Sequence, residues 1–304
     1  MRSNKQLNQA YSYCQQLANS HYENFPVASR LLPHRMRAPI AAIYAFARTA
    51  DDFADEGDIS DLQRLHALSS YHDLLRQIEK QQYRGRDPIF IALQDTVTRC
   101  ELPIHLLHNL LKAFEQDVVK SRYHSFSEVL DYCQFSANPV GHLLLHINGQ
   151  PTQQQLTQSD AICTALQLIN FYQDVIQDYT EQDRIYLPQD ELQRYGLDET
   201  HIITDNTEAF APLMLQLYNR TSVLFENGYL LGMTLNGRFG WEVRAICLAG
   251  LMLLIRLIEQ PKSDMFSRPR LTRRQILSVM LTSLNKRRYY NSVEAMLQIT
   301  RSLL

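Results

Sequence analysis

Apolar residues recur at every third or fourth position along most of the chain, which is the spacing of one face of an α-helix. The alternation of apolar and polar residues that is typical of half-buried strands is essentially absent. The pattern predicts helices over residues 6–22, 35–54, 61–82, 88–99, 103–120, 127–146, 153–179, 209–231, 240–259, 273–284 and 290–303. Ser127 suits an N-cap, and Pro88 and Pro103 suit first turns. We therefore expect an all-α, single-domain helical bundle over residues 1–304 with a central cavity.

Glycine and proline are scarce, with 10 and 11 residues respectively in a chain of 304. The links between the predicted helices are short, and none is low in complexity. The glycines stand apart from one another and form neither G-x-G-x-x-G nor G-x-x-x-x-G-K-[ST]. Neither a dinucleotide-binding turn nor a P-loop is therefore expected.

Charge and cysteine content argue against a nucleic-acid-binding protein and against a disulfide-bonded one. The 30 basic and 32 acidic residues leave a net charge of −2, which gives no electrostatic footprint for nucleic acid. The five cysteines are isolated and odd in number, so we expect reduced thiols and no disulfide framework. The amino-terminal residues are polar and lack the apolar core that is typical of a signal peptide. The longest apolar run covers residues 245–255, whereas a membrane-spanning helix needs about 20 residues. These features predict a soluble, cytoplasmic protein.

Two segments place acidic side chains on one side of a helix that is otherwise largely apolar. The first acidic stripe consists of Tyr44, Arg48, Asp51, Asp52, Asp55 and Glu56. The second acidic stripe consists of Gln167, Asn170, Asp174 and Asp178. At about 100° per residue, the main members of each stripe fall within an arc of roughly 60° to 80°. Because a narrow polar stripe on an apolar helix is typical of a face turned to a bundle interior, we expect both stripes to face a cavity.

Carboxylates four residues apart on a helix repel each other unless a cation lies between them. Mg²⁺ is usually bound by one or two carboxylates together with phosphate oxygens of a substrate. The expected Mg²⁺ ligands are Asp51, Asp52, Asp55, Asn170, Asp174 and Asp178. Arg48 lies on the first stripe and Arg184 just beyond the second, where bidentate hydrogen bonds to a diphosphate are expected. Such a site neutralises the charge that develops when diphosphate leaves an allylic or cyclopropylcarbinyl carbon.

The two stripes resemble the aspartate-rich motifs of the squalene and phytoene synthase family. The second stripe is followed by Arg-Ile-Tyr-Leu-Pro at residues 184–188, which is also similar to the family. The other matching positions are His21, Phe25, residues 31–33, Tyr132, Gly141 and Arg268. Within the family, residues 21–29 and 136–141 are most similar to the bacterial hydroxysqualene synthases of the hopanoid pathway. The resemblance covers nearly the whole chain.

The resemblance implies an isoprenoid (terpenoid) synthase fold and a Mg²⁺-dependent carbon–oxygen lyase that acts on presqualene diphosphate. The enzyme would ionise this substrate, allow the cyclopropylcarbinyl cation to rearrange, and capture the product cation with water to give hydroxysqualene. The implied catalytic residues are Asp51, Asp55, Asp174, Asp178, Tyr44 and Arg48. The implied substrate-binding residues are His21, Phe25, Arg48, Tyr132, Gln167, Asn170, Arg184 and Arg268. Glu23 and Tyr44 are candidates for positioning the water.

Residues 22–25 depart from the family pattern. Many relatives place a basic residue after the histidine, where it meets phosphate, whereas this chain has Glu23. This difference argues against binding of a second prenyl diphosphate. Two alternatives stay open: a synthase that condenses two prenyl diphosphates to presqualene diphosphate, squalene or phytoene, and a non-catalytic helical assembly factor on the same fold.

Several other polar residues have an ordinary structural interpretation. Asp117, Lys120, Arg122 and Tyr123 suit a solvated helix end, and the alternative is that they close the pocket. His142 and His146 have zinc-compatible spacing but no evident third ligand. Aromatic residues such as Phe171 pack in cores by default, although ring faces can stabilise a carbocation. The basic residues in 268–274 and 286–288 suit a solvated face and also fit an anionic membrane surface. The expected partners are thus an isoprenoid diphosphate and, peripherally, the inner face of the cell membrane; the oligomeric state is not indicated.

Overall fold

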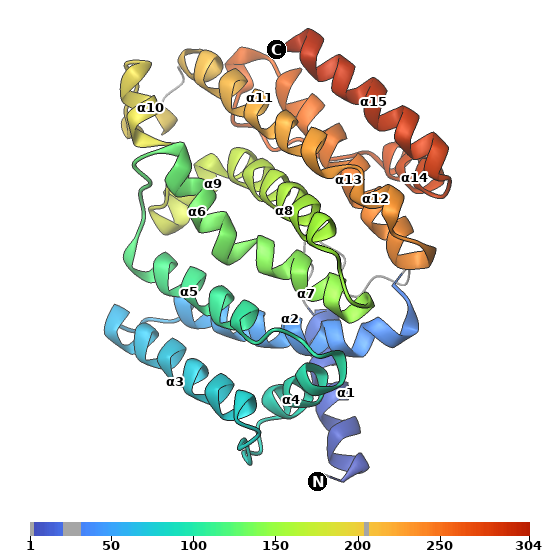
Figure 1. The fold of residues 1–304 in the computed structure, drawn as a ribbon. Coiled ribbons are helices and arrows are strands. Elements are labelled where there is room, and N and C mark those ends of the chain that lie inside the picture. Colours follow the sequence, from blue (N-terminus) through green and yellow to red (C-terminus); the bar gives the residue numbers. More distant parts are fainter. Residues whose placement is uncertain (1–2, 21–31, 204–206) are drawn as a thin grey trace. The chain divides into compact units, whose positions relative to one another are not determined.

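The computed structural model describes residues 3–20, 32–203 and 207–304. Within these ranges the regular secondary structure is helical, apart from one isolated parallel bridge between Arg122 and Ile185. The all-α prediction is confirmed (Figure 1). The chain divides into two compact units, residues 1–119 with 139–151 and residues 120–138 with 152–304. The extent of one domain over residues 1–304 stays a prediction.

The first unit is built around its second helix. Its elements are α1 (Asn4–Ser20), α2 (His34–Asp55), α3 (Asp61–Glu79), α4 (Pro88–Cys100), α5 (His105–Val119) and α7 (Asn138–Asn148). Helix α2 packs against α1, α3, α4 and α5. The ring of Phe46 in α2 lies 5.6 Å from that of Tyr71 and 6.0 Å from that of Phe90. This buried aromatic group fixes the apolar side of α2, so the polar positions of the helix lie outside the core of the unit.

The second unit packs three long helices together. Its elements are α6 (Phe126–Ser136), α8 (Gln153–Gln173), α9 (Val175–Gln182), α10 (Gln189–Arg194), α11 (Ala211–Gly228), α12 (Leu231–Thr234), α13 (Gly237–Ile258), α14 (Arg273–Ser283), α15 (Lys286–Leu303) and the 3₁₀ turns η1 (Glu199–Ile203), η2 (Thr207–Phe210) and η3 (Lys262–Asp264). Helices α8, α11 and α13 contact one another, and α14 and α15 pack on α13 (Figure 1). A Cβ atom on Gly250 of α13 would lie 2.6 Å from Leu166 and 2.8 Å from Phe225. Glycine therefore permits the close approach of these three helices.

Two of the predicted helices are divided in the structure. The predicted helix over 127–146 is interrupted at Ala137 between α6 and α7, and Pro139 occupies the first turn of α7, where its missing N–H is tolerated. The N-cap of α6 is Ser125, whose hydroxyl accepts from the Glu128 N–H, so the assignment of Ser127 was wrong. The predicted helix over 153–179 is interrupted at Asp174, which lies between α8 and α9 with φ −107° and ψ 10°.

Other helix ends follow local capping signals. Pro88 lies in the first turn of α4 as predicted, after Asp87, whose side chain accepts from the Ile89 N–H at 2.8 Å. Pro103 lies two residues before α5, so its assignment to a first turn was wrong. All five cysteines are free thiols, as predicted. Within the described ranges, we find no helix with both the length and the hydropathy needed to cross a membrane.

Candidate active site

The first acidic stripe gathers three carboxylates around one guanidinium. Arg48 Nη2 lies 2.8 Å from Asp52 Oδ1 and 2.9 Å from Glu56 Oε1. Its Nη1 lies 3.4 Å from Asp51 Oδ2. The side chains of Arg48 and Asp52 are only 24% and 32% exposed, so these pairs are partly shielded from water, whereas Asp55 is exposed. The helical spacing predicted this grouping on α2, and the cavity that the stripe was expected to face stays a prediction.

Arg64 fixes the end of the helix that carries the first acidic stripe. Its guanidinium, which comes from α3, donates to main-chain oxygens at distances of 2.7 to 3.1 Å. The accepting carbonyls belong to Phe53, Ala54, Glu56 and Gly57. The last carbonyls of a helix have no partner within the helix, so this side chain supplies what the end of α2 lacks. Gly57 has φ 83°, which favours glycine, and it turns the chain towards α3. The helical pattern did not reveal Arg64.

The second acidic stripe keeps its register across the junction of α8 and α9. The Asp174 N–H donates to the Asn170 carbonyl at 3.0 Å, and the Asp174 carbonyl accepts from the Asp178 N–H at 2.7 Å. Consecutive turns of backbone therefore still place Asn170, Asp174 and Asp178 one after another. The prediction of one continuous helix was wrong, but the spacing on which the stripe depends is retained.

Arg268 forms a bidentate ion pair with the second acidic stripe. Its Nε lies 2.8 Å from Asp174 Oδ1 and its Nη2 donates to Asp174 Oδ2 at 3.2 Å, which makes the pair bidentate. Its Nη1 donates to Gln177 Oε1 at 3.4 Å. The side-chain amide of Gln173 donates to the Pro269 carbonyl at 2.7 Å. The segment after α13 is therefore held on the end of α8 at two adjacent residues.

The negative charges of Asp174 and Asp178 are only partly balanced by the positive charges of Arg184 and Arg268. The pKa of Asp178 is raised to about 7, mainly by burial and also by the negative charge of Asp174, against the opposing effect of Arg184 and Arg268. Burial also raises the pKa of Asp174, and Arg268 opposes this change. Arg184 is buried beyond α9, and its main-chain N–H donates to the Asp178 carbonyl at 3.0 Å. Simultaneous ionisation of Asp174 and Asp178 is therefore unfavourable unless a further cation binds beside them.

Four aromatic rings gather beside the end of α8. Phe171 and Tyr186 are stacked with ring centres 3.7 Å apart, and Tyr123 stacks on Tyr186 at 5.3 Å. The ring of Tyr132 lies 5.6 Å from Tyr186 and 6.0 Å from Phe171. Tyr186 reaches this place because the Ile185 N–H donates to the Ser121 carbonyl at 2.9 Å and the two segments run parallel.

Residues 117–123 are not the simple solvated helix end that the sequence suggested. Tyr123 is fully buried in the aromatic group. Arg122 Nε lies 2.6 Å from Glu199 Oε1 and its Nη2 lies 2.7 Å from Asp183 Oδ1. The partners of Arg122 lie 61 and 77 residues further along the chain, so the local sequence pattern could not predict these contacts.

The remaining candidates have mixed outcomes. Tyr44, Gln167 and Asn170 are half-buried on α2 and α8. His21 and Phe25, and the water-positioning candidate Glu23, lie outside the described residues.

The donor atoms suit Mg²⁺ that arrives with phosphate oxygens. Among the described residues, no three His, Cys, Asp or Glu side chains are arranged to hold a metal ion by themselves. Mg²⁺ usually needs only one or two carboxylates when phosphate and water complete its shell. The raised pKa of Asp178 shows that its ionised form is disfavoured, and a divalent cation nearby would favour that form. The residues therefore fit a metal–diphosphate group better than a metal ion alone.

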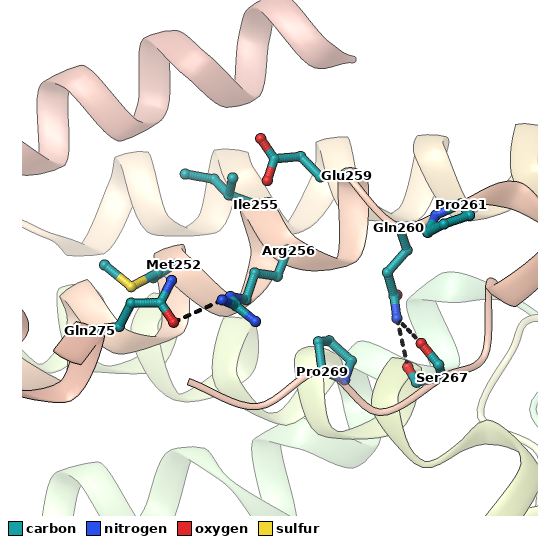
Figure 2. A pocket seen from close by; sticks show the side chains of 9 residues that line it. All are labelled: Met252, Ile255, Arg256, Glu259, Gln260, Pro261, Ser267, Pro269 and Gln275. Atoms are coloured by element: carbon teal, nitrogen blue, oxygen red, sulfur yellow. Dashed lines mark hydrogen bonds between the residues drawn. The ribbon is translucent and has the colours of Figure 1, made fainter. Parts of the chain in front are cut away.

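A hollow of about 430 Å³ is lined in part by Ser267 and Pro269, the sequence neighbours of Arg268 (Figure 2). It is lined by the end of α13, the segment around Ser267 and Pro269, and Gln275 of α14. The Gln260 amide donates to the Ser267 carbonyl at 2.9 Å, and Arg256 Nη2 donates to Gln275 Oε1 at 2.8 Å. These contacts hold the segment around Ser267 against the end of α13 and join α13 to α14.

Comparison with known proteins gives a consistent family. The model of the family described as "Squalene/phytoene synthase" matches residues 18–275. The chain is 36% identical over 230 residues to the hydroxysqualene synthase of Rhodopseudomonas palustris, covering 74% of this chain and 75% of that protein. It is 39% identical over 176 residues to the hydroxysqualene synthase of Zymomonas mobilis, covering 57% of each. The crystal structure of squalene synthase HpnC from Alicyclobacillus acidocaldarius has a TM-score of 0.77 and 32% identity, covering 84% of this chain and 95% of that one.

Proposed function

The chain belongs to the squalene/phytoene synthase family, and we propose that it is a Mg²⁺-dependent hydroxysqualene synthase. The reaction would convert presqualene diphosphate and water into hydroxysqualene and diphosphate. The observation that carries the proposal is the second acidic stripe, where the pKa of Asp178 is about 7 beside the charge of Asp174. Such a pair is suited to receiving a divalent cation. The names of the relatives at 36–39% identity support the choice of reaction.

Both acidic stripes would contribute ligands to the metal that binds with the diphosphate. The proposed ligands are Asp51, Asp52 and Asp55 of α2, with Asn170, Asp174 and Asp178 at the end of α8 and in α9. When bound, Mg²⁺ would neutralise the negative charge that develops on the diphosphate as the carbon–oxygen bond breaks. The lack of a three-ligand protein cage in the described ranges agrees with binding of the metal and diphosphate together.

The arginines of both stripes are already engaged with the acids that would bind metal. Arg268 pairs with Asp174, and Arg48 pairs with Asp52. With a cation on these carboxylates, the two guanidinium groups would be available for phosphate oxygens, to which they would donate bidentate hydrogen bonds. The buried Arg184 would add positive charge beside Asp178. The free protein would therefore keep its cationic groups in place through internal ion pairs.

The aromatic group would stabilise the carbocation that remains after diphosphate leaves. Tyr132, Phe171 and Tyr186 lie together beside the end of α8, and aromatic rings attract a cation. The rings carry no strong nucleophile, so capture of the product cation would fall to water. Tyr44 of α2 and Glu23 are the proposed residues for positioning this water.

We also propose a cytoplasmic location with peripheral contact to the inner face of the membrane. An isoprenoid diphosphate of this size has a long apolar portion that partitions into lipid.

Product analysis separates this proposal from condensation of two prenyl diphosphates. Purified protein with Mg²⁺ and presqualene diphosphate should release hydroxysqualene whether or not NADPH is present. Squalene formed only with NADPH would instead favour the activity named for the Alicyclobacillus protein. Rapid consumption of farnesyl diphosphate alone would favour a condensing enzyme. An inactive protein with all substrates, and no effect of Asp174→Asn on ligand binding, would leave a non-catalytic role.

A further inference from the structure

Helix α14 exposes a row of large apolar side chains. Ile276, Leu277, Leu281 and Leu284, here called the α14 apolar face, have 49%, 60%, 54% and 54% of their surface exposed. At about 100° per residue they fall within an arc of roughly 140°. Val279 of the same helix is buried, as expected for the side that packs on α13. Single exposed leucines are common on protein surfaces, whereas four on one helix face mark an interaction site.

The segment that carries this face is strongly basic. Residues 265–293 contain seven basic residues and no acidic residue. The rest of the chain then has 30 − 7 = 23 basic and 32 acidic residues, a net charge of −9. Arg273 and Arg274 begin the helix and Arg287 and Arg288 follow it, and all four are exposed. Positive charge is therefore concentrated at both ends of the α14 apolar face in a protein that is otherwise acidic.

We propose that the α14 apolar face binds the surface of an anionic lipid bilayer. A helix with an apolar face and flanking arginines lies in the plane of the interface, with its apolar side chains below the headgroups and its cations beside lipid phosphates. A second copy of the same surface would bring two segments of charge +7 together, which opposes self-association. An anionic bilayer matches both the apolar and the charged parts of the surface.

Binding to a bilayer rests on the proposed function for its role, because the proposed substrate is itself a membrane lipid. The basic segment also contains Arg268, which pairs with Asp174 at 2.8 Å. One stretch of chain, in one compact unit, would thus contact both the lipid phase and the second acidic stripe. Lipid binding itself needs no substrate and can be measured separately.

Vesicle sedimentation of the full-length protein tests the surface directly. The probe is a set of large vesicles, either pure phosphatidylcholine or a two-to-one mixture with phosphatidylglycerol. Leu277→Ser/Leu281→Ser removes apolar contact, and Arg273→Gln/Arg274→Gln removes charge. The matched control is Leu62→Ser/Val223→Ser, which changes two apolar side chains that are 80% and 45% exposed on α3 and α11.

The wild-type protein should bind the anionic vesicles, bind the neutral ones far less, and dissociate as salt is raised. At about fivefold in partition for each basic residue near the surface, the arginine variant should bind about 25-fold more weakly. The leucine variant should lose at least tenfold, and the control should match wild type. Absence of binding to anionic vesicles, or equal binding by all variants, would overturn the inference. Turnover of detergent-dispersed presqualene diphosphate should be equal in all four proteins, so loss of the proposed activity would be recognised separately.

Discussion

The pKa of Asp178 predicts that binding of Mg²⁺ with diphosphate depends on pH near neutrality. A protonated carboxyl is not a metal ligand, so the ionised fraction of Asp178 limits the affinity. With a pKa of about 7, this side chain is about one tenth ionised at pH 6 and about nine tenths ionised at pH 8. Its contribution should therefore strengthen binding about tenfold between these two values, and binding at pH 7 should release about half a proton from this group.

Calorimetry in two buffers of different ionisation enthalpy measures this proton release. Diphosphate titrates in the same range, so Asp178→Asn is the necessary control, because it keeps the ligand's own titration and removes that of the carboxyl. The wild-type protein should release more protons than the variant at pH 7, and the variant should bind more weakly at pH 8. Identical proton release and identical pH dependence in both proteins would show that Asp178 does not lose a proton when the ligand binds.

The same carboxyl should destabilise the protein when no metal is present. Its pKa is about 7 in the folded protein against 3.8 for an ordinary aspartate, so the folded state holds this proton more tightly. Between these two values the unfolded state binds fewer protons, and the contribution of Asp178 to the free energy of unfolding falls as pH rises. Asp178→Asn should therefore stabilise the metal-free protein at pH 8, by about 1–2 kcal/mol after allowance for solvent relaxation. Urea unfolding with a chelator at pH 5 and pH 8 checks the sign; a variant less stable than wild type at pH 8 would contradict it.

Three further predictions concern other described contacts. Arg64→Met should lower the free energy of unfolding by about 2 kcal/mol, because several carbonyls at the end of α2 lose their donor, with Arg64→Lys intermediate; thermal unfolding tests the order. Tyr186→Leu should reduce kcat more than KM while Tyr186→Phe stays near wild type, because the aromatic ring and not the hydroxyl is proposed to stabilise the cation; equal losses would argue against the ring. Burial lowers the pKa of His72 and His108, whose Nδ1 atoms lie 2.6 Å apart, so the free energy of unfolding should fall as pH drops through 6.5. Melting curves from pH 7 to pH 5 should show this loss, and it should be smaller in His108→Asn.

Helical periodicity was a good guide to where the chain is helical and a poor guide to where helices break. Helix α14 begins at Arg273 as predicted, because Thr272 caps it through a local hydrogen bond to Gln275. The junction at Asp174 leaves hydrogen bonds to Asn170 and from Asp178 in place, so the apolar pattern on either side continues through it. A helix break that keeps the spacing of apolar residues therefore cannot be detected from the apolar pattern.

The two acidic stripes could be predicted because each lies within a single local stretch of chain. The partner of Asp174 could not be found in this way, since Arg268 is 94 residues away and its position depends on how the segment after α13 folds. The same limit applies to Tyr123, which became part of the aromatic group through pairing with residues around Ile185. Resemblance to a family indicated Tyr132 and Arg268 as site residues but not what they contact.

We propose that the two acidic stripes hold one Mg²⁺–diphosphate group, and coupled binding of the metal and diphosphate is the decisive measurement. Inorganic diphosphate should bind the wild-type protein tightly only when Mg²⁺ is present, and Mg²⁺ alone should bind weakly. Asp51→Asn and Asp174→Asn should each abolish this metal-dependent binding, and the double variant should lose little more than either single one, because both residues act on one ligand. Metal-dependent binding that survives either substitution, or losses that simply add, would contradict the account.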